Sequence, residues 1–202
     1  MHQALRIVAF GSSSTEGIGA TAKEHCYPSA LQRILSQRLP GVVVVNRGIG
    51  GEDVDDMMHR LSLIIADKPD LVIWQTGSND ALRAVPVAHF IAETRDGIEQ
   101  MRAAGIDVIL MEPQLSEKLA GTAGSGAFRD AVRDVGEELS VPVVRRYDLM
   151  RAWLASGVLT HAQMMSGDGL HMTDGGYQKL AEAVADVILH AGRTAAPAVA
   201  AN

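Results

Sequence analysis

Short apolar runs, rich in branched side chains, recur along the chain between turn residues and charged residues. Five such runs predict buried strands, at Leu5–Phe10, Val42–Val45, Leu71–Trp74, Val108–Met111 and Val141–Val144. Runs that are apolar at nearly every position are typical of strands covered on both faces of a parallel sheet.

Segments with helical spacing lie between these runs. Apolar residues three and four positions apart predict helices at Leu31, Ile34 and Leu35; at Val54, Met57, Met58, Leu61, Ile64 and Ile65; and at Val87, Phe90, Ile91, Thr94, Ile98 and Met101. Pro28 suits the first turn of the first helix. A further helix, between Phe128 and Leu139, has a thinner apolar stripe.

A last helix is indicated by the spacing of Tyr177, Leu180, Val184, Val187 and Ile188. Thr173 or Asp174 could cap it, and Gly192 follows its expected end. Strands that alternate with helices form a parallel sheet, and right-handed crossovers place helices on both faces. We therefore expect an α/β fold, a three-layer α/β/α sandwich. Residues 1–192 are predicted to form one domain, and residues 193–202 a flexible tail.

The composition is that of an ordinary globular protein. Of the 202 residues, 47% are hydrophobic and 21% are charged, which argues against disorder, collagen-like repeats and coiled coils. The 18 Lys and Arg residues are outnumbered by 24 Asp and Glu residues, and no basic run could neutralise a phosphate backbone. Nucleic acid is therefore not an expected partner.

Neither an integral membrane segment nor a signal peptide is predicted. The apolar run at residues 4–10 is too short to cross a bilayer, and no small-residue cleavage site follows it. The single cysteine, Cys26, has no partner for an intrachain disulfide and no paired spacing for zinc. A cytoplasmic location is the default expectation, although an exported form with its signal peptide removed would have the same sequence. The oligomeric state stays open.

Three loops that follow predicted strands mix small, flexible and hydrogen-bonding residues. They are residues 11–15 (GSSST), 46–51 (NRGIGG) and 77–80 (GSND). Ligands of open parallel sheets bind at the carboxyl ends of the strands, so these loops are the first candidates for a site.

A carboxylate and an imidazole follow the last predicted strand, with Asp168 three residues before His171. A serine hydroxyl becomes a nucleophile when a base takes its proton, and that base needs a carboxylate to orient it. Ser13, His171 and Asp168 could supply these parts. Ser13, Gly51 and Asn79 could donate N–H groups to the oxyanion that acyl transfer creates.

Taken in order, four blocks resemble those of the SGNH hydrolase family, the GDSL-type lipases and esterases: Phe10–Thr15, Gly51, Gly77–Asp80 and Asp168–His171. The resemblance implies a flavodoxin-like, five-stranded parallel sheet and a serine ester hydrolase. Ser13 would be the nucleophile, Asp168 and His171 its acid–base pair, and Ser13, Gly51 and Asn79 the oxyanion hole. No cofactor and no metal are expected. The substrates would be small-molecule, glycan or lipid acyl esters, with short acetyl-like acyl groups favoured.

Three positions depart from the family pattern. Ser12 stands where the family name has Asp, and Ser14 stands where it has Leu, so three adjacent serines compete for the role of nucleophile. The block alignment favours Ser13. Met172 replaces the proline that often follows the family's histidine, a change expected to loosen the loop without removing a functional group.

Other interpretations stay open beside this one. Gly50 could replace Gly51 as a donor, and Asn79 or Asp80 could simply cap a helix. Residues 17–22 match a G-x-G-x-x-A pattern, so a nucleotide-binding module is one alternative and a catalytically inactive binding module is another. No G-x-S-x-G elbow supports an α/β-hydrolase.

Two further segments are interpreted from their composition. The acidic cluster is read as a helix start, where the helix dipole favours negative charge, rather than as a metal site: Glu52, Asp53, Asp55 and Asp56. The segment Gln114–Gly126, rich in Gly, Ala and Ser, is expected to be a mobile loop bordering the acyl pocket. The leaving group stays open.

Overall fold

The computed structural model describes residues 4–194 and has a five-stranded parallel sheet at its centre. The strands are β1 (Arg6–Gly11), β2 (Val43–Gly48), β3 (Leu71–Gln75), β4 (Asp107–Met111) and β5 (Val143–Val144), in the spatial order β2-β1-β3-β4-β5. Each overlaps a predicted apolar run, so the predicted α/β sheet is confirmed. Strand β5 has only two residues and directly follows Pro142, whose nitrogen has no hydrogen to donate.

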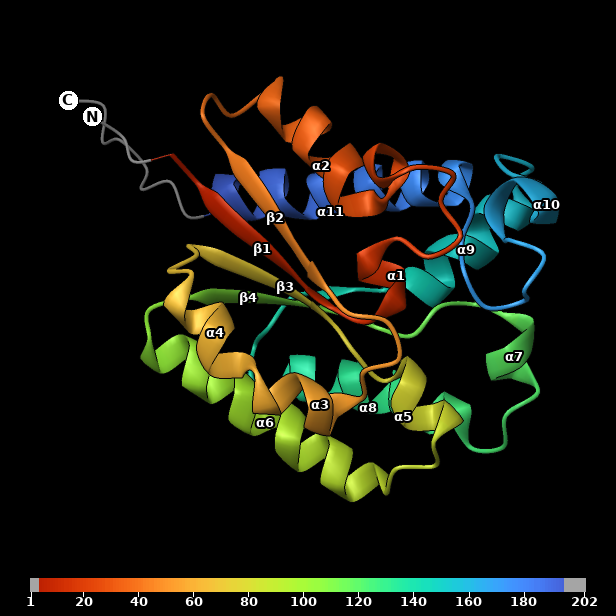
Figure 1. The fold of residues 1–202 in the computed structure, drawn as a ribbon, viewed down its shortest axis with the longest axis horizontal. Coiled ribbons are helices and arrows are strands. Elements are labelled where there is room, and N and C mark those ends of the chain that lie inside the picture. The colour runs from red at the N-terminus through yellow and green to blue at the C-terminus, as the bar shows by residue number, and fades with distance from the viewer. Residues whose placement is uncertain (1–3, 195–202) are drawn as a thin grey trace.

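Helices cover both faces of the sheet and make the sandwich three-layered (Figure 1). One face carries α2 (Tyr27–Ser36), α9 (Arg146–Ala155), α10 (His161–Met164) and α11 (Asp174–Thr194). The other carries α3 (Val54–His59), α4 (Leu61–Ala66), α6 (Val87–Ala103) and α8 (Ser125–Glu138). Short helices lie in the connections: α1 (Ser13–Glu16), η1 (Lys23–His25), α5 (Ser78–Leu82) and α7 (Glu117–Ala120).

Alternate residues of the strands divide the core into two halves. On β1, Ile7 and Ala9 pack with α2 and α11, whereas Val8 and Phe10 pack with α3, α6 and α8. Successive side chains of a strand point to opposite faces, so a strand covered on both sides is apolar at every position. Within residues 4–194, no helix is both long enough and apolar enough to cross a membrane.

Two helix boundaries differ from the sequence predictions. The apolar stripe from Val54 to Ile65 predicts one helix, but α3 and α4 are separated at Arg60, whose backbone angles (φ −113°, ψ 8°) are not helical. At this break, the side chain of Arg60 donates hydrogen bonds to backbone carbonyls of β1 and β2. Helix α11 continues past Gly192 to Thr194, so residues 193 and 194 of the predicted tail are helical. The rest of that tail lies outside the described residues.

The loops after β1, β2 and β3 meet at one edge of the sheet. After β1 the chain passes to the face of α2, and after β2 it passes to the face of α3. Since β1 lies between β2 and β3, this is the point where the strand order reverses, and a crevice at such a point is the usual ligand site of an open α/β sheet.

Candidate active site

A hydrogen-bonded chain of three side chains lies at the carboxyl end of β1. Ser13 Oγ is 2.8 Å from His171 Nε2, and His171 Nδ1 is 2.5 Å from Asp168 Oδ2. The structure thus brings together the three residues nominated from the sequence, although Ser13 and His171 are 158 positions apart. With Nδ1 facing the carboxylate, Nε2 is the ring atom that can take a proton from the serine.

The carboxylate of Asp168 is surrounded by hydrogen-bond donors from its own turn. Its Oδ1 accepts the N–H groups of Leu170 and His171, both at 2.9 Å, and the hydroxyl of Ser166 at 2.7 Å. Burial opposes ionisation, but these bonds and the one from the His171 ring hold the pKa of Asp168 well below its usual range. Asp168 therefore stays charged and can orient the imidazole.

The turn that presents Ser13 is tied to β3 through Gln75. Gln75 Oε1 accepts the Ser12 N–H at 3.0 Å and the hydroxyls of Ser12 and Thr15 at 3.1 and 3.3 Å. Ser12, which stands in the place of the family's Asp, thus donates hydrogen bonds toward the sheet. Sequence reasoning missed Gln75. Its signal was a polar residue at the end of an otherwise apolar strand.

The three adjacent serines have different surroundings. Ser12 is bound to Gln75 and Ser14 is buried, whereas Ser13 contacts His171. Ser13 is also the first residue of α1, where helical amides lack an intrahelical partner, and no residue between 4 and 194 accepts its N–H. The geometry therefore favours Ser13 among the three.

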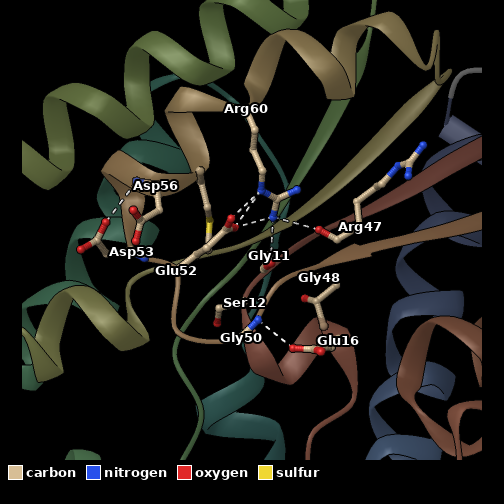
Figure 2. Close-up of polar contacts among 12 residues, drawn as sticks. Gly11, Ser12, Glu16, Arg47, Gly48, Gly50, Glu52, Asp53, Asp56 and Arg60 are labelled. Carbon is tan, nitrogen blue, oxygen red and sulfur yellow. Dashed lines mark hydrogen bonds and ion pairs between the residues drawn. The ribbon is translucent and has the colours of Figure 1, made fainter.

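The N–H groups of Gly50 and Gly51 differ in whether they already have a hydrogen-bond acceptor. Gly50 N–H donates to Glu16 Oε2 at 2.7 Å and is already engaged (Figure 2). Gly51 has a φ of +84°, a left-handed conformation that glycine adopts without strain, and none of the described residues accepts its N–H. This difference favours Gly51 over Gly50 as an oxyanion donor.

Asn79 lies in the first turn of α5 and reaches the loop of Gly51. Its Nδ2 donates to the carbonyl oxygen of Glu52 at 2.7 Å, and an amide nitrogen carries a second hydrogen that a substrate oxygen could accept. Asp80 next to it is buried and accepts the N–H groups of Gly77 at 3.1 Å and Val54 at 2.8 Å. Asp80, rather than Asn79, therefore satisfies the start of the helix. Burial raises the pKa of Asp80 to about 6.

The glycines of the G-x-G-x-x-A pattern have packing roles. Gly17, with a φ of +108°, ends α1. Gly19 lies so close to the loop of His171 that a Cβ atom would come within 2.4 Å of the carbonyl oxygen of Met172. Between them, the carbonyl of Ile18 accepts the Tyr177 hydroxyl at 2.6 Å. This segment supports the His171 loop, which explains its glycines without a nucleotide.

Met172 does not loosen the loop, contrary to the expectation from its replacement of proline. Its side chain is fully buried, and its backbone forms an antiparallel bridge with Met165. The two hydrogen bonds of this bridge come from neighbouring residues, with the Ser166 N–H donating to the His171 carbonyl at 2.8 Å and the Thr173 N–H to the Met164 carbonyl at 3.0 Å, so packing and pairing hold the loop.

The acidic residues after Gly51 are engaged in a helix cap and in ion pairs. Asp53 caps α3 in a reciprocal capping box with Asp56, and Arg83 pairs with both of them. Glu52 pairs with Arg60, and both side chains are only 13% exposed. The cluster therefore begins a helix, as the sequence analysis expected.

The segment 114–126 is more ordered than the predicted loop. It contains α7, which begins where Ser116 Oγ accepts the N–H of Leu119. The side chain of Gln114 is buried between Ser78 and the carbonyl of Leu170. The segment borders a pocket, but neither Ser13 nor His171 lines it. Ser116 could have indicated this helix from the sequence, because serine is a favoured N-cap residue.

Related proteins span most of this chain. An arylesterase from Vibrio mimicus is 25% identical over 185 residues, which cover 91% of this chain and 88% of the relative. An acetylxylan esterase from Xylanibacter ruminicola is 24% identical over 92% of this chain and 43% of the relative. The crystal structure of a lipase/acylhydrolase from Enterococcus faecalis matches with a TM-score of 0.77 at 26% identity, covering 93% of this chain and 96% of the other.

The fold and these relatives define the class of the protein, a carboxylic ester hydrolase of the SGNH type. More narrowly, the chain belongs to the non-GDSL lipase-like family, whose model matches residues 1–194.

Proposed function

We propose that the protein hydrolyses esters by a two-step acyl transfer at Ser13. His171 Nε2 takes the proton of Ser13 as Oγ attacks the ester carbonyl carbon, and it then gives that proton to the leaving alcohol as the C–O bond breaks. In the second step, His171 takes a proton from a water molecule that attacks the acyl carbon, and it returns that proton to Ser13 Oγ as the bond to the acyl group breaks and the acid leaves. Asp168 stabilises the charged imidazole in both steps. The contact of 2.8 Å between Ser13 Oγ and His171 Nε2 carries this proposal.

The negative charge on the attacked carbonyl oxygen would be held by three donors, the N–H groups of Ser13 and Gly51 and the Nδ2 of Asn79. They come from three loops that are fixed before substrate binds, by the bonds to Gln75, by the capped start of α3 after Glu52 and by the bond from Asn79 to Glu52. Donors already in place need no reorganisation during the reaction, which makes them effective. This chemistry needs no cofactor.

We further propose short, acetyl-like acyl groups as the preferred substrates. The acetylxylan esterase among the relatives supports this choice. The evidence for the acyl preference is independent of the evidence for Ser13 as nucleophile, so each of these two proposals has its own readout in the experiment. The alcohol could belong to a small molecule, a glycan or a lipid.

The first experiment measures the hydrolysis of p-nitrophenyl esters, from acetate to palmitate, by the wild type and by Ser13→Ala. Loss of the nucleophile should lower kcat by several orders of magnitude, on the order of 10⁴-fold or more. Ser12→Ala and Ser14→Ala are the matched controls and should lose far less. Activity in a folded Ser13→Ala variant would overturn the assignment of the nucleophile, and a maximum at long acyl chains would overturn the acyl preference.

A further inference from the structure

We propose that Arg60 is a positioning residue that holds the oxyanion hole in shape through its ion pair with Glu52. The inference rests on the proposed function, because that function gives Gly51 and Asn79 their roles as donors. Arg60 lies at the break between α3 and α4, outside the triad and the three donor loops.

The guanidinium of Arg60 connects the ends of two strands with the loop of Gly51 (Figure 2). Its Nε donates to both carboxylate oxygens of Glu52 at 2.8 Å. Its Nη2 donates to the carbonyl of Gly11 at 3.2 Å, at the end of β1, and to the carbonyl of Arg47 at 2.9 Å, near the end of β2. One side chain therefore binds the strand that leads to Ser13, the strand that leads to Gly51 and the residue that follows Gly51.

The plane of the guanidinium is fixed by the aromatic core beneath it. The central carbon of Arg60 lies 4.6 Å from the centre of the Phe10 ring, and Phe10 stacks on Trp74 at 5.6 Å. A cation over an aromatic face is attracted to it, most strongly where water is excluded. Arg60 thus has a defined orientation before any substrate binds.

Glu52 links Arg60 to both candidate donors, Gly51 and Asn79. Its backbone follows Gly51 directly, and its carbonyl oxygen accepts Nδ2 of Asn79. The side chain of Glu52 points to Arg60 while its carbonyl points to Asn79, and its backbone continues directly from Gly51, so the position of this one residue influences both donors.

Removal of Arg60 alone would leave the Glu52 carboxylate nearly buried and without its cation. A buried charge without a partner is costly, so the carboxylate would turn toward water and its peptide would move with it. Both donors would then lose their alignment. Because the disturbance comes from the unpaired carboxylate, replacing Glu52 as well should cause no further loss of kcat. The effects of the two substitutions on kcat should therefore not be additive.

The experiment compares Arg60→Met, Glu52→Gln and the double variant with the wild type and with Ser13→Ala. It measures kcat and KM on p-nitrophenyl acetate, thermal unfolding, and inhibition by an alkylboronic acid, whose tetrahedral adduct on Ser13 would resemble the reaction intermediate. Arg47→Met is the matched control, because Arg47 is a neighbouring arginine whose exposed side chain pairs with Asp67 instead of Glu52.

We expect kcat of Arg60→Met to fall about 10- to 100-fold, less than the loss of a whole donor, with KM changed by about twofold at most. The affinity for the boronic acid should fall in parallel, because it depends on the same donors. The double variant should be no worse than Arg60→Met, and Arg47→Met should resemble the wild type.

A folded Arg60→Met variant with wild-type kcat and boronate affinity, beside an inactive Ser13→Ala, would overturn this proposal and leave the proposed function standing. An active Ser13→Ala variant would instead overturn the proposed function. A change confined to KM would also overturn the role of Arg60. The residue is proposed to act through donors to the oxyanion, and the loss of such donors lowers kcat. If Arg60→Met does not fold, Arg60→Lys and Glu52→Gln decide, and an unchanged kcat and boronate affinity in both would overturn the proposal.

Discussion

The side-chain amide of Asn79 donates to the backbone carbonyl of Glu52 at 2.7 Å, and this bond joins the loop after β3 to the loop after β2. Two of the proposed oxyanion donors are therefore fixed relative to each other. A change at Asn79 removes a donor and also releases the carbonyl of Glu52, the residue that follows Gly51.

Asn79→Ala should lower kcat about 100- to 1,000-fold and change KM little, because its interaction with the oxyanion develops in the transition state. Steady-state kinetics on p-nitrophenyl acetate checks this. Ser78→Ala is the matched control, since it also deletes a side-chain hydrogen bond of α5, the one to Gln114. An Asn79→Ala enzyme with full activity would remove Asn79 from the oxyanion hole.

Gly51→Ala should lower kcat more than Gly50→Ala. At Gly51 there is space for a methyl group, since the nearest atom to its Cβ position is Arg83 Nη2 at 4.0 Å, but the φ of +84° strains any residue with a Cβ. Relaxing that strain would turn the N–H away, at a cost in kcat of about tenfold or more. The kcat of both variants on one ester, measured after each is shown to be folded, gives the comparison. Equal losses, or a greater loss in Gly50→Ala, would argue that Gly50 is the donor.

Asp168→Asn should lower kcat about 10⁴-fold, because an amide neither holds the imidazole in the required tautomer nor stabilises its charged form. Asp55→Asn is the control. It removes a carboxylate from another pair with histidine, the exposed contact of 2.7 Å to His89. Comparable activity in the two variants would contradict the role of Asp168.

The lowered pKa of Asp168 also has a consequence for stability. A carboxylate whose pKa is lower in the folded state stabilises the fold above its unfolded pKa, near 4, and loses that effect as the pH falls through its folded value. The free energy of unfolding of the wild type should therefore approach that of Asp168→Asn below about pH 4. Urea unfolding at several pH values measures this, and a constant difference would contradict it.

Asp80 should have the opposite dependence on pH. Burial raises its pKa to about 6, so between about pH 4 and pH 6 the folded chain binds a proton that the unfolded chain does not. The stability of the wild type should fall with rising pH, by about 3 kcal/mol at most, relative to an Asp80→Asn variant that cannot titrate.

Urea unfolding of the wild type and Asp80→Asn, from pH 4 to pH 7.5, tests this dependence. Asp96→Asn, changed on the exposed side of α6, is the control and should track the wild type. A difference between wild type and Asp80→Asn that does not vary with pH would show that Asp80 is ionised throughout.

Strands β1 and β3 were predictable because they are buried on both faces, which leaves apolar residues at every position of Val8–Phe10 and Leu71–Trp74. The break between α3 and α4 was not predictable. The apolar stripe is continuous there, and the Arg60 side chain bonds to carbonyls that are 49 and 13 positions away in sequence. The spacing of apolar residues within a segment does not reveal hydrogen-bond partners that are so distant in the sequence.

The same division applies to the site. Asp168 and His171 could be paired from their spacing, and the resemblance to the SGNH blocks favoured Ser13 among the three adjacent serines that follow the first strand. Gln75 and Arg60 could not be assigned, because a lone glutamine and a lone arginine have many ordinary uses. Their significance comes from the turn at Ser12 and the carboxylate of Glu52, which only the folded chain places beside them.

The bond from Ser13 to His171 spans 158 positions of the chain. Under the proposed mechanism, a nascent chain gains esterase activity only after residues 168–171 have left the ribosome and packed against Ser13, so ester hydrolysis reports the formation of this long-range contact. A fragment that ends before Asp168 would be an inert scaffold, and activity restored by adding the missing C-terminal piece would measure how well the two parts recognise each other.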